Sequence, residues 1–522
     1  MSGFARFIII LTTVSAAIME LIDTSIVNVA LSQISGNLGS TIEDASWVIT
    51  AYAIANVIII PMTGFLARYF GRKNYYVGSI ILFTITSFMC GNSTSLWELV
   101  FWRFVQGIGG GALLSTSQGI LFDAFPPNKR GVASGLFGMG IVLGPTIGPT
   151  FGGLIVDNYH WSWIFDINIP FGILATFLAL NYIDKKPEEL NINRSAITID
   201  YWGVLFLAIG VGSLQYVLEK GQTDDWFNDF WIRTFSLSAF TGIALFIWRE
   251  LTTAHPIIDL RVLKSTNLIA SNVLTFVCGF GLFGSVFVFP VVVQRIMGYT
   301  PTEAGLAIVP GALMGLVMMP FIGKRLQAGT SPIYFVVIGF IAFMLHGYLS
   351  SLATIDSGRS WFIVPQIFRG IGTACLTVPL INQAVIGLAP KEMPSGIALT
   401  NMLRQLGGAF GIAVMNTYVS RRYAIHRTDL VSNLQGNDPE TIDRLNAYAA
   451  GAMSRGYNAL DAKNMSLGIL EGTVSRQSFL LSYLDAFFLI TVFFICASPF
   501  ILMLRTQKLD KATQAKVAEE AH

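Results

Sequence analysis

Long apolar stretches separated by short polar segments run through most of the 522-residue chain. A helix needs about 20 consecutive apolar residues to cross the ~30 Å hydrocarbon core of a bilayer. Fourteen stretches approach this length, and each predicts a transmembrane helix: 7–31, 47–67, 75–92, 97–120, 132–156, 163–182, 201–218, 231–249, 267–293, 303–323, 333–352, 360–388, 396–419 and 479–504. The pattern therefore predicts an all-α membrane protein whose surroundings are the lipid bilayer.

Lysine and arginine are unequally divided between the loops that join these predicted helices. Short cytoplasmic loops of membrane proteins carry an excess of basic residues. Alternate loops here hold most of them: Arg68, Arg72, Lys73, Lys129, Arg130, Lys185, Lys186, Arg194, Arg249, Arg261, Lys264, Lys324, Arg325, Lys391 and the tail from Arg505. The opposite short loops hold Lys220, Arg295 and Arg359. We therefore predict that both termini are cytoplasmic and that the long polar segment 420–478 is extracytoplasmic.

Composition agrees with a membrane protein and argues against several functional classes. Hydrophobic residues make up 53% of the chain and charged residues 12%, with a mean hydropathy of +0.61. A net charge of +2 without a basic patch argues against a nucleic-acid partner. The four cysteines lack C-x-x-C spacing, which argues against a metal site. No G-x-x-x-x-G-K-[ST] sequence or catalytic triad is found, so neither ATP hydrolysis nor another enzyme activity is predicted, and an ion gradient is the expected energy source.

Short sequences recur about 260 residues apart in the same order. "IPMTG" at 60–64 is similar to "MPFIG" at 319–323, and "QGIGGGALL" from Gln106 is similar to "RGIGTACLT" from Arg369. Self-similarity at a long period indicates a duplicated unit. The predicted domains are a six-helix half (1–183), a linker with two inserted transmembrane helices (184–266), a second six-helix half (267–505) that includes loop 420–478, and a cytoplasmic tail (506–522).

Two acids interrupt the first predicted helix. At a rise of 1.5 Å per residue, Asp23 lies ~12 Å from the outer end of this helix, and Arg103 lies ~9 Å from the same surface in the fourth. Ionisable groups inside a membrane usually pair or face a water-filled cavity. We therefore predict that Asp23 and Arg103 interact in a central cavity, although a fixed salt bridge or a pair at the rim accounts equally well for their depth. Glu20 is a candidate for a second protonation site or for a contact with a cationic drug.

Several motifs resemble those of the EmrB/QacA-type fourteen-helix drug:proton antiporters of the major facilitator superfamily. "LIDTSIVNVAL" resembles their first-helix motif, and "RFVQGIGGG" resembles their fourth-helix motif. "GMGIVLGPTIGPTFGG" resembles the antiporter motif of helix 5, and "WSWIFDINIP" resembles the start of helix 6. The resemblance covers nearly the whole chain and implies the major-facilitator fold.

The resemblance also implies a function. It implies proton-coupled export of amphipathic, drug-like compounds by alternating access across the bacterial inner membrane, with no cofactor besides the proton gradient. It further implies an EmrA-like periplasmic adaptor and an outer-membrane channel as partners in a tripartite pump. Proton coupling is assigned to Asp23, Glu20 and Arg103, and the substrate cavity to Asn28, Gln106, Asp166, Arg369 and Arg404. A facilitator or importer of a specific metabolite is the alternative.

Two further motifs carry conformational predictions. The helix 5 motif comprises Gly140, Gly144, Pro145, Gly148, Pro149, Gly152 and Gly153. Its glycine spacing indicates close helix packing, either as a static groove or, as the resemblance favours, as a moving contact between the halves. "GFLARYFGRK" resembles the gating loop between helices 2 and 3, with Gly64, Arg68, Gly71, Arg72 and Lys73, but has Arg68 where the superfamily usually has Asp. These basic residues are equally explained as cytoplasmic anchors.

Overall fold

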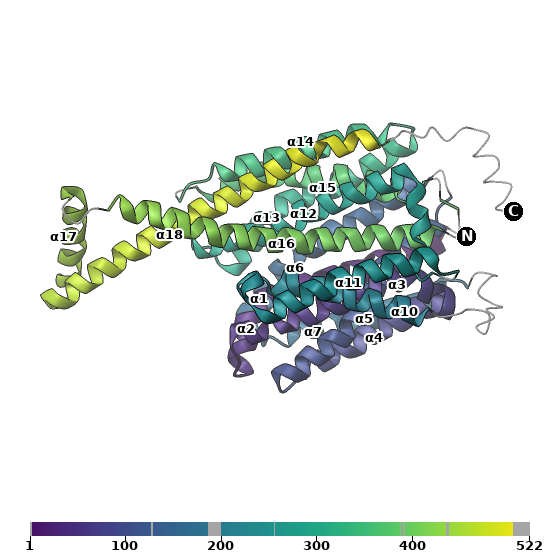
Figure 1. Cartoon of the computed structure of the whole chain (residues 1–522), viewed down its shortest axis with the longest axis horizontal. Coiled ribbons are helices and arrows are strands. Elements are labelled where there is room, and N and C mark those ends of the chain that lie inside the picture. The colour runs from purple at the N-terminus through teal and green to yellow at the C-terminus, as the bar shows by residue number, and fades with distance from the viewer. Residues whose placement is uncertain are drawn as a thin grey trace.

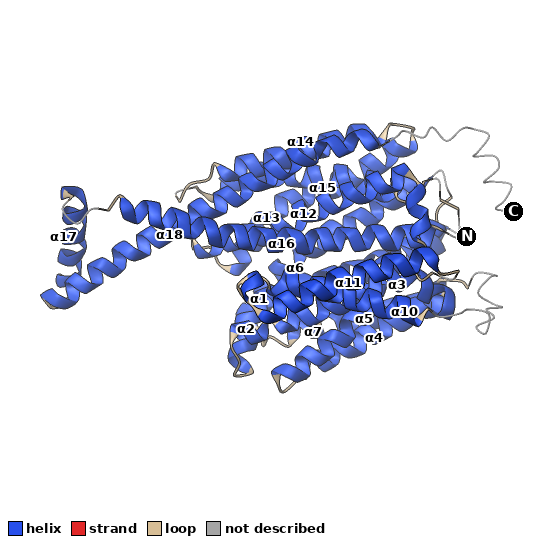
Figure 2. Ribbon diagram, in the orientation of Figure 1, coloured by secondary structure: helices blue, strands red, loops and turns tan. Residues whose placement is uncertain are grey.

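The computed structural model describes residues 3–126, 129–185, 200–254, 256–355, 357–386, 388–389, 392–434 and 438–504. Within these ranges all regular elements are helices, and there is no strand (Figure 2). The predicted all-α class is therefore confirmed. The predicted tail 506–522 and three of the predicted basic loop positions, Lys186, Arg194 and Lys391, lie outside the described residues.

The helices follow the predicted apolar stretches closely. The N-terminal helix group comprises α1 (Gly3–Asn37), α2 (Ile42–Ala45), α3 (Trp47–Phe70), α4 (Arg72–Gly91), α5 (Leu96–Asp123), α6 (Arg130–Asn158), α7 (Trp163–Asp166) and α8 (Asn168–Tyr182). The inserted pair is α10 (Tyr201–Lys220) and α11 (Phe230–Thr252), with the short turns η3 (Trp226–Asn228) and η4 (Leu260–Lys264). The C-terminal helix group comprises α12 (Thr266–Arg295), α13 (Pro301–Gln327), α14 (Pro332–Ser351), η5 (Arg359–Phe362), α15 (Ile363–Gln383), α16 (Met393–Ser432), α17 (Pro439–Met453), α18 (Ala459–Ala497) and η6 (Ser498–Met503).

Twelve spans in the described part of the chain are long and apolar enough to cross a membrane. The long helices α5 and α16 are not among the twelve. Both carry polar side chains within the helix, and α16 continues into a charged sequence. The predicted count of fourteen transmembrane helices is therefore not confirmed.

Local signals in the sequence explain where several helices begin. The Ser95 hydroxyl accepts from the Glu98 amide at the start of α5, and Thr300 and Glu303 form a capping box at the start of α13. Asp229 Oδ1 accepts from the amides of Trp231 and Ile232 at 2.7 and 3.0 Å at the start of α11. These side chains satisfy amide groups that have no partner inside the helix.

The packing of the N-terminal group recurs in the C-terminal group (Figure 1). The contacts α1–α6, α3–α5, α4–α5 and α4–α8 have the counterparts α12–α16, α13–α15, α14–α15 and α14–α18. The two groups meet chiefly through α6 against α13 and α3 against α16. The helix α10 of the inserted pair packs on both α3 and α16, so it covers one side of this seam.

One end of the bundle, where α1 begins and η6 ends, is called the base here, and the opposite end is called the tip (Figure 1). Toward the base the two groups share apolar contacts, among them a cluster that includes Leu21, Leu121, Phe137, Ile381 and Ile397. Toward the tip the N-terminal group has an apolar cluster of its own, which includes Ile26, Ile34, Leu96 and Trp161. The seam is therefore more extensively closed at the base than at the tip.

The segment 420–478 is a correction to the sequence analysis. It was predicted to be a loop. Instead α16 continues to Ser432, α18 begins at Ala459, and α17 packs on α18, so that a helical extension projects beyond the tip (Figure 1). A hydropathy pattern marks where a helix leaves the bilayer, and charged residues with good helix propensity let the helix continue in water.

Candidate functional site

Asp23 of α1 and Arg103 of α5 form a buried ion pair. Arg103 Nη1 lies 2.5 Å from Asp23 Oδ2, and the two side chains are 1% and 0% exposed. Both helices are apolar around these positions, so each charge would be strongly unfavourable without the other. The structure thus brings together the two residues for which the sequence predicted similar depths in the membrane.

Arg103 is held by further contacts from three helices. Its Nε donates to the Val48 carbonyl oxygen at 3.2 Å, and its Nη1 also donates to Gln106 Oε1 at 2.7 Å. The guanidinium carbon lies 4.1 Å from the ring centroid of Tyr52 and 5.5 Å from that of Phe165. Cation–π contacts of this kind stabilise a cation that has been removed from water.

The second oxygen of Asp23 accepts from two amide side chains. Gln106 Nε2 lies 3.2 Å and Asn168 Nδ2 lies 2.9 Å from Asp23 Oδ1. Both amides also donate to the Ser87 hydroxyl, at 2.7 and 3.3 Å. This Asp23 cluster therefore links α1, α4, α5 and α8, and it solvates the carboxylate with fixed protein dipoles in place of water.

Glu20 lies one turn away on α1 and is 2% exposed. Its Oε1 accepts from Asn56 Nδ2 of α3 at 3.0 Å, whereas its Oε2 has no hydrogen-bond partner among the described residues. The Arg404 guanidinium of α16 acts on Glu20 electrostatically. Glu20 therefore differs from Asp23, which pairs with a cation of its own helix group, in that a cation of the C-terminal helix group acts on it.

Arg404 belongs to a polar contact that crosses the seam. Its Nη2 donates to Asn401 Oδ1 at 2.6 Å. Asn401 Nδ2 in turn donates to Ser115 Oγ and Gln118 Oε1 of α5, both at 3.1 Å. Arg404, which was predicted for the substrate cavity, is thus linked through Asn401 to α5 of the N-terminal group.

The other residues predicted for a substrate cavity do not join the Asp23 cluster. Asn28 has an exposed side chain on α1 and donates only to carbonyl groups of its own helix. Asp166 lies against α4, where a Cβ placed on Gly91 would be 2.7 Å from Asp166 Oδ1. Asn168, which follows Asp166 by two residues and therefore points about 200° away from it, reaches Asp23. Arg369 is 4% exposed, and its Nη1 has no partner in the described part of the chain.

The glycine motif of α6 packs against α1 of the same half. The prediction that it forms a contact between the halves is therefore wrong. A Cβ on Gly144 would lie 2.2 Å from Leu21 Cβ, one on Gly148 would lie 1.9 Å from Ser25 Oγ, and one on Gly152 would lie 2.9 Å from Ile26 Cγ1. Pro145 and Pro149 lie inside the same helix. Successive motif glycines differ by four residues and so share one face, and only the tertiary structure shows that this face meets α1.

A different face of α6 meets the C-terminal helix group. A Cβ on Gly131 would lie 2.8 Å from the Gly323 carbonyl oxygen, and one on Gly305 would lie 2.4 Å from Thr150 Oγ1. These two contacts lie near opposite ends of α6. The contact between the halves that was expected of the motif glycines is therefore made by other residues of the same helix.

The predicted gating loop lies at the base. Gly64 packs against Pro394: a Cβ placed on Gly64 would be 3.4 Å from Pro394 Cβ. This contact joins α3 to α16 across the seam. Gly71 has a φ of 83°, which favours glycine between α3 and α4. Arg72 forms an ion pair with Asp123, and Lys73 Nζ donates to the Leu180 carbonyl oxygen at 2.7 Å. Arg68, which replaces the usual acid, is exposed.

Besides Asn168, three residues of the site were not predicted as functional. Asn56, Tyr52 and Ser87 contact Glu20, Arg103 and Gln106, respectively. Asn56 was visible as a polar residue inside an apolar stretch, which is a signal of an intramembrane partner. No group of three or more His, Cys, Asp or Glu side chains that could hold a metal ion occurs within the described ranges.

Comparisons with known proteins agree with this architecture. The sequence profile of the Major Facilitator Superfamily matches residues 13–412. The chain is 33% identical over 465 residues to the "Multidrug export protein EmrB" of Escherichia coli strain K12, covering 88% of this chain and 87% of that protein. It is 32% identical over 497 residues to the "Fatty acid resistance protein FarB" of Neisseria gonorrhoeae, covering 94% of each.

Solved structures share the fold at low sequence identity. The human organic anion transporter MFSD10 superposes with a TM-score of 0.59 at 11% identity, covering 97% of this chain and 100% of that chain. The proton:xylose symporter XylE superposes with a TM-score of 0.57 at 12% identity, covering 94% and 96%. At these identities the likeness concerns the fold alone.

Proposed function

Because this chain belongs to the Major Facilitator Superfamily, we propose that it is a proton-coupled exporter of amphipathic toxic compounds that works by alternating access. The chain is a multi-pass membrane protein. Relatives that it matches over most of its length are a multidrug export protein and a fatty acid resistance protein. The observation that carries the proposal is the fully buried Asp23–Arg103 pair, which lies within the helix group that must move as a unit.

The proposed topology has fourteen transmembrane helices. In it α5 and the part of α16 inside the bundle are added to the twelve apolar spans of the described residues, since both pack on membrane-spanning helices. The helices form two six-helix halves, 1–183 and 267–505, with α10 and α11 of the linker 184–266 inserted between them. Both termini lie in the cytoplasm and the membrane is the bacterial inner membrane, so that the base faces the cytoplasm and the tip faces outward.

In the proposed mechanism, protons act through the two acids of α1. Protonation of Asp23 would remove the charge that Arg103, Gln106 and Asn168 now stabilise, and it would therefore loosen the connection between α1, α5 and α8. Protonation of Glu20 would weaken its attraction to Arg404 in the opposite helix group. The first step changes how firmly the helices of the N-terminal group are held together, and the second changes how firmly the two groups are held across the seam. An exporter needs such changes in order to couple proton flow to the change of state.

The arrangement of the seam supports an outward-facing state. The shared apolar cluster closes the base, whereas the tip has separate clusters, and the exposed Asn28 lies on the part of α1 between Asp23 and the tip. Asn28, Gln106 and Arg404 are the proposed substrate contacts, with Arg369 deeper in the C-terminal group. The proposed energy source is the proton gradient, without a bound cofactor.

We further propose partners for the helical extension at the tip. An EmrA-like periplasmic adaptor and an outer-membrane channel would complete a tripartite pump, and the extension made by α16, α17 and α18 is the surface that reaches farthest from the bundle (Figure 1). Apolar side chains that it exposes include Ile425, Val431, Ile442 and Leu460. Their exposure beyond the predicted bilayer supports a protein contact there.

The deciding experiment measures proton movement in liposomes. Purified protein is reconstituted with a pH-sensitive dye inside, the pH is made equal on both sides, and ethidium is added outside. An antiporter takes up ethidium and releases protons, so the lumen becomes alkaline. Acidification of the lumen would show symport, and ethidium uptake without a pH change would show facilitated diffusion. Either result would overturn the proposal in favour of an importer or a facilitator.

A further inference from the structure

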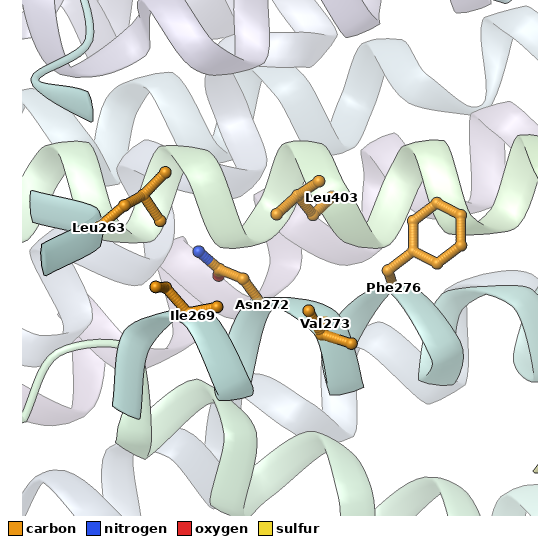
Figure 3. Close-up of a pocket in the computed structure, with 6 residues that line it drawn as sticks. All are labelled: Leu263, Ile269, Asn272, Val273, Phe276 and Leu403. Atoms are coloured by element: carbon orange, nitrogen blue, oxygen red, sulfur yellow. The ribbon is translucent and has the colours of Figure 1, made fainter. Parts of the chain in front are cut away.

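A cavity of about 420 Å³ lies between α12 and α16, beside η4 (Figure 3). It is called the side pocket here, and it is lined by Leu263, Ile269, Asn272, Val273, Phe276 and Leu403. Five of the six lining residues are apolar and none is charged. The volume is within the range of pockets that bind small molecules, which are mostly apolar with a few placed polar groups.

Asn272 supplies the single polar side chain of the side pocket. Its Oδ1 accepts from the Thr400 hydroxyl at 2.8 Å, which fixes the orientation of the amide. Its Nδ2 has no hydrogen-bond partner in the described structure, although the residue is only 2% exposed. Figure 3 shows this nitrogen directed from α12 toward α16, between Leu263 and Leu403. A buried amide hydrogen without an acceptor is unfavourable. Nδ2 has almost no accessible surface of its own, so an occupant can supply the missing acceptor once the lining side chains shift.

The lining defines the chemistry of the missing occupant. Its body must be apolar, because the surrounding side chains offer only hydrocarbon contacts apart from Asn272. It must present one hydrogen-bond acceptor to Asn272 Nδ2. It must be uncharged, since no side chain of the lining compensates a charge and an uncompensated buried charge is strongly unfavourable.

The side pocket lies on the flank of the bundle toward the base. Asn272 is the seventh residue of α12, and Leu263 belongs to the turn before that helix. Ile269 is 37% exposed on a helix apolar enough to span a membrane, so this rim of the pocket meets lipid. A molecule dissolved in the adjoining leaflet therefore reaches the pocket without crossing water.

Helix α16 separates the side pocket from the seam. Leu403 lines the pocket and Thr400 donates to Asn272, whereas their neighbours Asn401 and Arg404 belong to the contact with α5. The Asn272–Thr400 hydrogen bond thus connects the polar residue of the pocket to α16, the helix that carries the cross-seam contact. An occupant of the pocket and a movement of α16 would both act on this hydrogen bond.

We propose that the side pocket is a first binding site for uncharged amphipathic molecules that leave the bilayer, with Asn272 donating to their acceptor group. The proposal rests on the proposed function, because such molecules are substrates only if the chain is an exporter. It adds a site apart from the Asp23 cluster, a ligand class and a recognition residue.

The test uses photolabelling of the full chain in lipid nanodiscs without a proton gradient. Benzophenone is the probe, because it is uncharged and apolar and has one carbonyl acceptor, and labelled residues are found by peptide mass spectrometry. Labels are expected on α12 and on α16 around Leu403. Asn272→Leu should raise the concentration for half-maximal labelling about tenfold, the change expected for a lost hydrogen bond to a buried group. Diphenylmethane, which lacks the carbonyl group, should compete about equally well in both proteins.

A second variant keeps the test informative if Asn272→Leu folds poorly. Val273→Trp fills the pocket and should abolish the labels, whereas the matched Val337→Trp, on the exposed face of α14, should leave them unchanged. Three results would overturn the proposal: labels on other parts of the chain, an equal loss of affinity for benzophenone and diphenylmethane in Asn272→Leu, or a tightly retained lipid that blocks labelling. Ethidium antiport by the unmodified protein is measured in parallel. Antiport without pocket labels refutes the pocket alone, and pocket labels without antiport refute the proposed function alone.

Discussion

Asp23 occupies a position where its charge is unfavourable in isolation and compensated by three neighbours. Arg103 supplies the opposite charge, and Gln106 and Asn168 donate to the second oxygen. Burial favours the protonated form of a carboxyl group and a nearby guanidinium favours the ionised form. Moving α5 relative to α1 would separate Asp23 from Arg103 and Gln106, so the compensation of its charge depends on how the two helices are placed.

Asp23→Asn should separate substrate binding from proton coupling. The amide keeps the shape of the side chain and cannot titrate, so ethidium should still bind while gradient-driven ethidium transport in liposomes falls by at least about tenfold, the factor that 1.4 kcal/mol represents. Asp166→Asn is the matched control, because Asp166 is an acid outside the Asp23 cluster. Transport by Asp23→Asn at the rate of the unmodified protein would assign Asp23 a structural role, and Glu20→Gln would then be the variant to measure.

Arg103→Ala should destabilise the protein through its partner. Removing one member of a buried ion pair costs about 3–5 kcal/mol, because the remaining charge is buried without compensation. We expect lower expression and a lower melting temperature in detergent. The double variant Asp23→Asn with Arg103→Met should recover most of the stability. No recovery would mean that Arg103 stabilises the fold chiefly through Val48 and Tyr52.

At the scale of elements, α1 and α6 approach closely because glycines replace side chains along one face. Leu21, Ser25 and Ile26 of α1 fill the positions that side chains on Gly144, Gly148 and Gly152 would need. In a membrane, such packing is a main source of helix association because the lipid offers no hydrophobic driving force. The same contact fixes the rotation of α1 and therefore the direction of Asp23.

Gly144→Leu should abolish export while membrane insertion remains, because the new Cβ would lie 2.2 Å from Leu21 Cβ and would push α1 away. Gly119→Leu on α5 is the matched control, since no atom lies within 4 Å of a Cβ at that position. Melting temperature and ethidium transport are measured for both. Equal behaviour of the two variants would contradict the close packing of α1 on α6.

At the scale of the whole molecule, two helix groups with recurring internal contacts meet along a seam that is closed at the base. Gly64 and Pro394 mark this closure, because they join the predicted gating loop to the start of α16. Alternating access requires that the two residues separate once in each cycle.

A disulfide between these positions should stop transport reversibly. A Cβ at Gly64 would lie 3.4 Å from Pro394 Cβ, close to the spacing of about 3.5–4.5 Å that disulfides adopt. Gly64→Cys with Pro394→Cys, in a Cys496→Ser background, should cross-link under oxidation and lose ethidium transport, and a reducing agent should restore it. Each single cysteine variant is the control. Transport that continues in the cross-linked protein would rule out opening of the base.

The sequence by itself determined most of the helices and the residues that carry charge into the membrane. Apolar length sets the position of a span, and the cost of burying a charge singles out Glu20, Asp23 and Arg103, whatever the arrangement of the helices. The resemblance of the motifs to known antiporters gave the fold class, and the family match agrees with it.

Only the tertiary structure decided which faces meet. Hydropathy says that a helix crosses the membrane but not how it is rotated, so the sequence could not show that Asn168 rather than Asp166 reaches Asp23, or that the α6 glycines face α1. It also could not show that Glu20 is influenced by Arg404, because the two residues are far apart in the chain and their proximity depends on how the two helix groups pack. The continuation of α16 and α18 beyond the bilayer depends on helix propensity and packing, which a pattern of apolar residues does not report.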